Sequence, residues 1–200
     1  MKNNKVSIYI LNTKLVKNNL EKVLSVLSER DKEKANKYKQ QKDYFLSLAG
    51  SFLVEKYTPK AEIKFNEFGK PYKPGIEYNI SHSGNYAVLA VGNNPVGIDI
   101  EKERKYNQKL LGKIFCEKEI EEIKNSQDYF AMWTRKESLL KSNGIGIDKH
   151  LYKISCLPKD KKVFVGETYF CKTMSFDGHI MSVTVKSNTD FSASVEFVNI

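Results

Sequence analysis

The sequence is poor in cysteine and contains no long apolar run. Cys116, Cys156 and Cys171 lie far apart and form no CxxC pair, which argues against a zinc site and favours free thiols in a reducing compartment. No stretch approaches the roughly 20 apolar residues of a membrane-spanning helix. The apolar run at residues 6–11 is too short for a secretory signal. We therefore expect a cytoplasmic protein that does not contact a membrane.

Positive charge is what the chain has in excess. It carries 33 Lys and Arg against 24 Asp and Glu, a net charge of +9 over 200 residues. Such a surface attracts anions, which include nucleic acid, anionic lipid, phosphorylated ligands and acidic proteins. With 40% hydrophobic and 28% charged residues, the composition excludes a disordered or low-complexity chain. The length suits one domain, or two small halves that share a core.

Hydrophobic periodicity predicts helices and strands in the same order twice. The first half is expected to contain a strand at 5–11, helices at 18–30 and 31–57, and strands at 62–65, 76–81, 86–92 and 96–101. The second half is expected to contain helices at 107–124 and 127–142, and strands at 151–156, 162–171, 178–186 and 191–198.

The predicted fold class is α+β. We expect two similar halves, residues 1–103 and 104–200, related by a pseudo-twofold axis. Each half is a small, mostly antiparallel sheet packed on a long helix. In the first half, the strand at 96–101 is expected to be the third strand of an antiparallel meander.

Two carboxylates stand two positions apart in the predicted strand "VGIDIE". Strand alternation points Ile98 and Ile100 to one face and Asp99 and Glu101 to the other. Carboxylates about 7 Å apart along a strand can converge on one divalent cation, and oxygen ligands suit Mg²⁺ or Mn²⁺. A solvated acidic face explains the same alternation.

A second charged cluster lies in "FAMWTRKESLLKSNGIG", residues 130–146. Its helical face contains Trp133, Lys136, Glu137, Leu140 and Lys141. Gly144 and Gly146 follow the helix and permit close backbone approach. Lysines beside a carboxylate suit a site that binds phosphate and metal together. The alternative is a solvent-facing ion pair between Glu137 and Lys141, with Trp133 in the core.

Two turn segments add polar groups. In "NISHSG", Ser81 and His82 adjoin in sequence, so their side chains tend to diverge, and the GxSxG motif of a nucleophile elbow is missing. Phosphate binding is therefore favoured over nucleophilic catalysis, with a structural histidine as the alternative. In "FGKPY", Gly69 and Pro71 fix a turn that presents Lys70. An ordinary exposed lysine explains this turn equally well.

These four segments occur in the order and spacing that resemble the 4′-phosphopantetheinyl transferase superfamily, in its two-halved, surfactin-synthetase-activating branch. The resemblance covers residues 28–147 and is strongest over 65–147. It implies a monomer with coenzyme A and Mg²⁺ between two α+β halves. The implied reaction moves the phosphopantetheine arm of coenzyme A to a serine hydroxyl of an acidic apo acyl or peptidyl carrier protein, and releases adenosine 3′,5′-bisphosphate.

The resemblance also implies roles for individual residues. The metal ligands would be Asp99, Glu101 and Glu137. The catalytic residues would be Glu137, Lys141 and Glu119, with Glu137 as base directly or through a water. The residues that bind coenzyme A would be Lys34, Ser47, Lys70, Pro71, Ser81, His82, Lys136 and Lys141.

The chain departs from the family pattern near its N-terminus. Members often carry a basic residue where Asp31 stands here, and an Arg-Thr pair where Leu46 and Ser47 stand. The contact to the 3′-phosphate of coenzyme A is therefore open, and Lys32 or a neighbouring lysine could supply it.

Two other classes of protein remain as alternatives. A metal-dependent phosphohydrolase would use Asp99, Glu101 and Glu137, with water as the acceptor. A basic nucleic-acid-binding module would need a recognition helix or a sheet with stacking aromatics. The sequence shows neither, so we expect no nucleic-acid partner.

Overall fold

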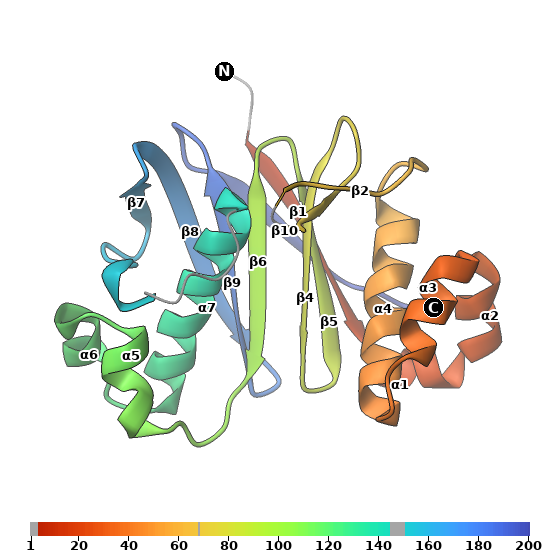
Figure 1. The fold of residues 1–200 in the computed structure, drawn as a ribbon, viewed down its shortest axis with the longest axis horizontal. Helices are drawn as coiled ribbons and strands as arrows, with labels where there is room; N and C mark the ends of the chain where they lie inside the picture. The colour runs from red at the N-terminus through yellow and green to blue at the C-terminus, as the bar shows by residue number, and fades with distance from the viewer. Residues whose placement is uncertain (1–3, 68, 145–150) are drawn as a thin grey trace.

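The computed structural model describes residues 4–67, 69–144 and 151–200, which form two four-stranded sheets, each packed against one long helix (Figure 1). The first sheet has the strand order β10-β1-β5-β4, and the second has the order β6-β9-β8-β7. The strands are β1 (Lys5–Asn12), β4 (Glu77–Ser83), β5 (Tyr86–Gly92), β6 (Val96–Lys102), β7 (Lys161–Phe164), β8 (Glu167–Phe176), β9 (His179–Lys186) and β10 (Ser192–Phe197). The α+β class and the two sheet-containing halves are confirmed.

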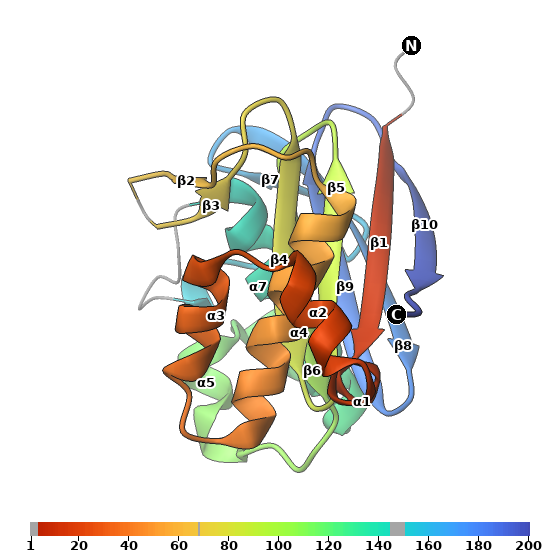
Figure 2. The same ribbon diagram turned by 90° about the vertical axis from the view of Figure 1, so that its right-hand side faces the viewer.

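Helices cover the outer faces of the two sheets. They are α1 (Thr13–Asn18), α2 (Leu20–Val26), α3 (Glu29–Asn36), α4 (Gln41–Tyr57), α5 (Leu111–Ile114), α6 (Glu117–Glu122) and α7 (Ser126–Asn143), with 3₁₀ turns at Gln108–Leu110 and Leu151–Lys153. Figure 2 shows α1 to α4 together on the outer side of the first sheet. A short ribbon of β2 (Lys64–Phe65) and β3 (Pro71–Tyr72) lies outside both sheets.

Several predicted elements are wrong in extent or type. The helix predicted over 31–57 is two helices, because α3 folds back on α4 and buries Ala35, while Ser51 donates a hydrogen bond to Asp31. The strand predicted over 162–171 is the β7–β8 hairpin, which turns at Gly166 with a φ of 75°. The strand predicted over 151–156 begins as a 3₁₀ turn. The helix predicted over 18–30 is likewise α2 followed by the start of α3.

The strand β6 does not belong to the meander predicted for the first half. It pairs antiparallel with β9, so it is the edge of the second sheet, while β10 from the end of the chain pairs parallel with β1. Each sheet therefore contains a strand from the other part of the chain. The division at residue 103 stays a prediction.

The strand edges β4 and β6 are joined by side chains. Asn79, Ser81 and Ser83 accept hydrogen bonds from the backbone N–H groups of Ile98, Ile100 and Lys102 respectively. These contacts advance by two residues on both strands, so β4 and β6 run parallel, side by side at the centre of the molecule (Figure 1). Alternate side chains of β4 thus accept hydrogen bonds from the backbone N–H groups of β6. In a continuous sheet, backbone carbonyl groups would accept these bonds.

The predicted alternation in β6 is confirmed. Ile98 and Ile100 are buried in an apolar core between the two sheets, with residues from β1, β5 and β9. The carboxylates of Asp99 and Glu101 leave the opposite face of the strand, the face toward α7.

The helix α7 lies unusually close to β6 at Gly97. A Cβ atom at this position would lie 2.0 Å from the Ser138 carbonyl oxygen and 2.3 Å from the Ser142 N atom. Small hydroxyl side chains one turn apart permit this approach and use their hydroxyls: Ser138 bonds to Thr184 of β9, and Ser142 donates to the Pro95 carbonyl. The same approach places Glu137 and Lys141 over the polar face of β6.

We predict that Gly97→Ala disrupts this packing. The methyl group would overlap backbone atoms of α7, so we expect the free energy of unfolding to fall by about 3 kcal/mol. The control is Gly112→Ala, where no atom of the described residues lies within 4 Å of the added Cβ. Urea denaturation of both variants measures the difference, and equal stabilities would contradict the close approach.

Candidate active site

Asp99 is the centre of a polar cluster between β4, β6 and α7. Its Oδ1 atom accepts hydrogen bonds from Lys141 Nζ at 2.6 Å and from Ser81 Oγ at 2.9 Å. The side chain is nearly buried, and its Oδ2 atom has no hydrogen-bond partner among the described residues. Burial raises the pKa of Asp99, the bonds from Lys141 and Ser81 oppose this rise, and Glu101 adds to it.

Glu137 faces the same cluster from α7. It is 4% exposed, and its Oε1 atom has no partner in the described part of the chain. Burial raises the pKa of Glu137 to about 7, with a further contribution from the charge of Asp99 and opposition from Lys141. A buried carboxyl group that titrates near neutral pH can accept and release protons under physiological conditions.

Glu101 is the third carboxylate of the cluster and is held from two sides. Its Oε2 atom accepts a hydrogen bond from Ser83 Oγ at 3.0 Å and one from Arg104 Nη1 at 2.8 Å. The charge of Glu101 raises the pKa of both Asp99 and Glu137. The three predicted metal ligands thus influence one another electrostatically.

These carboxylates have the chemistry of a divalent-cation site, although as placed they do not form a closed one. No three His, Cys, Asp or Glu side chains in the described ranges are grouped closely enough to hold a metal ion. Among the residues that the structure describes, the buried oxygens Asp99 Oδ2 and Glu137 Oε1 nevertheless lack hydrogen-bond partners, and hard cations prefer such carboxylate oxygens. The donor set fits Mg²⁺ or Mn²⁺.

Two of the predicted ligands for coenzyme A, Ser81 and His82, border this cluster, and a third, Ser47, lies on α4. His82 is exposed beside it, and its pKa is lowered first by desolvation and then by the positive charges of Lys141 and Lys34. The Ser47 hydroxyl on α4 is buried without a partner among the described residues. Ser81 is shared with Asp99 and Lys141. The structure therefore brings β4, α3 and α7 residues to one region.

Lys70 and Pro71 lie at the base of the turn that follows β2. The Lys70 ammonium donates to the Val96 carbonyl at 3.3 Å, and desolvation lowers its pKa against the opposing charge of Glu77. Phe68 of the predicted "FGKPY" motif and Gly146 lie outside the described residues.

A pocket between α3, α4, β4 and the β2–β3 ribbon contains Arg30, which the sequence motifs did not identify. Arg30 and Lys34 of α3 line it together with Phe65 and Pro71. The Arg30 guanidinium carbon lies 5.1 Å from the centre of the Phe65 ring. Asp31, the acidic departure from the family pattern, accepts hydrogen bonds from two serine hydroxyls, those of Ser28 and Ser51.

The structure does not bring Lys136 and Glu119 to the cluster. Both side chains are fully buried and form an ion pair of 2.7 Å. Lys136 also donates to the carbonyls of Leu151 and Ile154, and Glu119 accepts from the N–H of Cys156 at 2.6 Å. Through these bonds, the ion pair holds the segment that begins at Leu151 against α6 and α7. As placed, neither side chain can contact a phosphate or a substrate hydroxyl.

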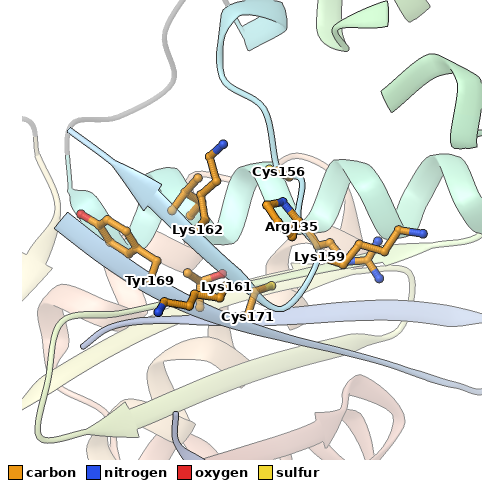
Figure 3. Close-up of a pocket in the computed structure, with 10 residues that line it drawn as sticks. Arg135, Cys156, Lys159, Lys161, Lys162, Tyr169 and Cys171 are labelled. Carbon is orange, nitrogen blue, oxygen red and sulfur yellow. The ribbon is translucent and has the colours of Figure 1, made fainter. Parts of the chain in front are cut away.

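A second small pocket lies on the other side of α7, and none of the predicted site residues lines it. Arg135, Lys159, Lys161 and Lys162 surround it, but the charged ends of the three lysines point in different directions (Figure 3). Cys156 and Cys171 are free thiols there, and burial raises the pKa of each. This pocket lacks the convergent groups of an anion site.

The sequence reasoning missed residues that hold the cluster in place. Asn79 and Ser83 flank Ser81 at spacings of two, and this alternation of short polar residues along β4 was the available signal. Arg104 follows "GIDIEKE" directly and is three residues from its partner Glu101. Arg30 left no motif signal, because its place in the pocket depends on α3 folding back on α4.

Two family models match the chain in succession. Residues 14–94 match the N-terminal region of 4′-phosphopantetheinyl transferases, and residues 95–184 match the 4′-phosphopantetheinyl transferase superfamily. The models meet directly before β6.

Curated relatives agree with these matches. The 4′-phosphopantetheinyl transferase Sfp of Bacillus subtilis is 28% identical over 202 residues, which cover 90% of each chain. The 4′-phosphopantetheinyl transferase gsp of Aneurinibacillus migulanus is 38% identical over 62% of this chain and 58% of its own length. The L-aminoadipate-semialdehyde dehydrogenase-phosphopantetheinyl transferase of Homo sapiens is 26% identical over 76% of this chain and 59% of its own length.

The chain belongs to the 4′-phosphopantetheinyl transferase superfamily, as an enzyme of the Sfp-like type.

We predict that Glu119→Gln destabilises the fold more than it changes the site. Removing one charge leaves Lys136 buried and unpaired, which costs about 3 to 5 kcal/mol. The matched control is Glu122→Gln on the same helix, whose partner Lys159 is half exposed, and we expect it to change stability by less than about 1 kcal/mol. Denaturant unfolding measures both. Similar small changes would mean that the buried pair is not structural.

We predict that Glu137→Gln stabilises the protein at high pH. The folded-state pKa of Glu137 is about 7 against an ordinary value of 4.5, so folding favours the protonated form, and stability is lost as the pH rises through 7. Removing the charge should add about 3 kcal/mol at pH 8 and almost nothing at pH 4. Unfolding is measured across this range with a chelator present. The control Glu121→Gln is exposed, and equal pH profiles for the two variants would refute the shift.

Proposed function

We propose that this enzyme transfers the 4′-phosphopantetheine arm of coenzyme A to a serine hydroxyl of an apo carrier protein. The observation that supports it most directly is the cluster at Asp99. Two buried carboxylates meet a lysine and a serine there, and each carboxylate has one oxygen without a hydrogen-bond partner in the described part of the chain. These residues come from three motifs of the family. The names of the relatives describe phosphopantetheinyl transfer, and the donor and the serine acceptor are part of the proposal.

We assign two chemical tasks to the residues of this chain: removal of the proton of the carrier serine, and neutralisation of the pyrophosphate charge. The carrier serine oxygen attacks the phosphorus that bears the pantetheine arm, and the bond to the second phosphate breaks. Adenosine 3′,5′-bisphosphate leaves, and the serine proton goes to Glu137, directly or through a water. Its pKa of about 7 suits this role. Lys141 neutralises the pyrophosphate charge.

A divalent cation fits the proposal as a further component. Asp99, Glu101 and Glu137 would hold Mg²⁺, with Mn²⁺ as the alternative. When bound, the metal would neutralise pyrophosphate oxygens and stabilise the charge that develops during transfer. Arg104 and Ser83 keep Glu101 in position on the edge of β6.

The nucleotide end of coenzyme A is assigned to the pocket between α3, α4 and β4. Arg30 and Lys34 line it, and Lys32 is paired with Glu29 at 2.7 Å. Arg30 and Lys34 therefore take the 3′-phosphate contact that the sequence pattern left open, with Ser47, His82, Lys70 and Pro71 around the rest of the nucleotide. Lys136 has no role in this proposal, because its ammonium is occupied in the core.

The remaining assignments concern partners and setting. The net charge of +9 would steer an acidic acyl or peptidyl carrier protein to the enzyme and make the association rate salt-sensitive. We assign a monomer in the cytoplasm. Among the described residues, no helix is long and apolar enough to cross a membrane.

The test is the mass of a carrier protein. Purified enzyme is incubated with coenzyme A, Mg²⁺ and each of several apo carriers, and the intact mass of each carrier is measured. Added phosphopantetheine supports the proposal. No addition to any carrier refutes it, and cleavage of coenzyme A without a carrier would indicate a phosphohydrolase.

We predict that Asp99→Asn lowers the transfer rate by about 100-fold or more, because the cluster loses a buried charge at its centre. The variant should keep its circular dichroism spectrum. The control Asp190→Asn changes an exposed aspartate paired with Lys172 and should transfer at the normal rate. Full activity of the Asp99 variant would remove this residue from the mechanism.

A further inference from the structure

The Lys141 ammonium occupies a cradle made of oxygen atoms. Its Nζ atom lies 2.6 Å from Asp99 Oδ1, 3.2 Å from Ser81 Oγ and 3.2 Å from the Ile98 carbonyl oxygen. A carboxylate, a hydroxyl and a backbone carbonyl are also the ligands that hard divalent cations take in proteins. One position on Asp99 thus suits two different cations.

The negative charges of the other two carboxylates near Lys141 are not neutralised to the same degree. Glu101 is paired with Arg104, whereas Glu137 has no ion pair among the described residues. The charge of Lys141 lowers the pKa of both Asp99 and Glu137, so it is the cation that these two buried groups share. A divalent ion at the same place would compensate both more fully.

We propose that Lys141 and the divalent cation compete for Asp99, so that metal binding moves the Lys141 ammonium off Asp99 and makes it available to the pyrophosphate of coenzyme A. Lys141 would then couple the two ligands. It weakens metal binding when coenzyme A is absent, and it strengthens coenzyme A binding once the metal is present. By linkage, coenzyme A strengthens metal binding by the same factor.

The packing of α7 permits this movement. The Lys141 side chain is 30% exposed, whereas Lys136 on the same helix is 0% exposed. The long flexible stem of Lys141 can therefore carry its ammonium to a new partner without opening the core. The hydroxyl contacts at Ser138 and Ser142, which fix α7 against the second sheet, need not change.

The test measures Mn²⁺ binding to the whole enzyme by the electron paramagnetic resonance signal of free Mn²⁺, first without coenzyme A. Lys141→Met removes the competing ammonium and keeps the length of the side chain. We expect its affinity for Mn²⁺ to be about ten-fold higher than that of the natural enzyme, which lies within the usual range of coupling between sites.

Two controls separate competition from the general loss of positive charge. Lys34→Met removes one charge from the same region without touching a carboxylate of the cluster, and it should leave Mn²⁺ affinity within about two-fold. Lys141→Arg keeps the charge and should also bind Mn²⁺ weakly. An unchanged affinity for Lys141→Met, or an equal rise for Lys34→Met, overturns the proposal.

The second readout is the effect of coenzyme A on Mn²⁺ affinity, with coenzyme A alone in buffer as the blank. Coenzyme A should raise the affinity more in the natural enzyme than in Lys141→Met, and equal rises overturn the coupling. The inference rests on the proposed function for the choice of ligands, but its tests need no carrier protein. Tighter Mn²⁺ binding by Lys141→Met, together with no transfer to any carrier, would refute the function and support the competition.

Discussion

The close contact between α7 and β6 at Gly97 is the constraint on which the rest of the site depends. A side chain at this position would meet the backbone of α7, so the strand and the helix touch main chain to main chain. Glu137 and Lys141 are on the helix, and Asp99 and Glu101 are on the strand. The distance between the two elements therefore sets how strongly these charges act on one another.

The join between the two sheets serves the same site. The side chains of Asn79, Ser81 and Ser83 accept hydrogen bonds from the backbone of β6. The two serine hydroxyls also donate to Asp99 and Glu101. One row of short polar side chains thus holds the sheets together and orients the carboxylates. The hydroxyls of Ser81 and Ser83 are structural and functional at the same time.

Much of this could be predicted from the sequence, and the limits have physical causes. The alternation of Ile98, Asp99 and Ile100 correctly predicted which side chains are buried between the sheets, because that alternation is local. The burial of Lys136 could not be predicted from helical spacing, since its partner Glu119 and the carbonyls after residue 150 come from other segments. The position of Arg30 likewise depends on the tertiary turn between α3 and α4. The metal ligands and the binding of coenzyme A remain predictions.

Strand β6 belongs to the second sheet and β10 to the first, and this affects when each sheet can form during synthesis on the ribosome. Strand β1 emerges early, but the partner for its outer edge is β10, near the end of the chain. Strand β6 must likewise wait for β9. Neither sheet has all of its strands until β9 and β10 have been made. The nascent chain therefore exposes unpaired strand edges, which can pair with the wrong strand. The first described strand, β1, thus gains its outer partner only when β10, the last of the described strands, has been made.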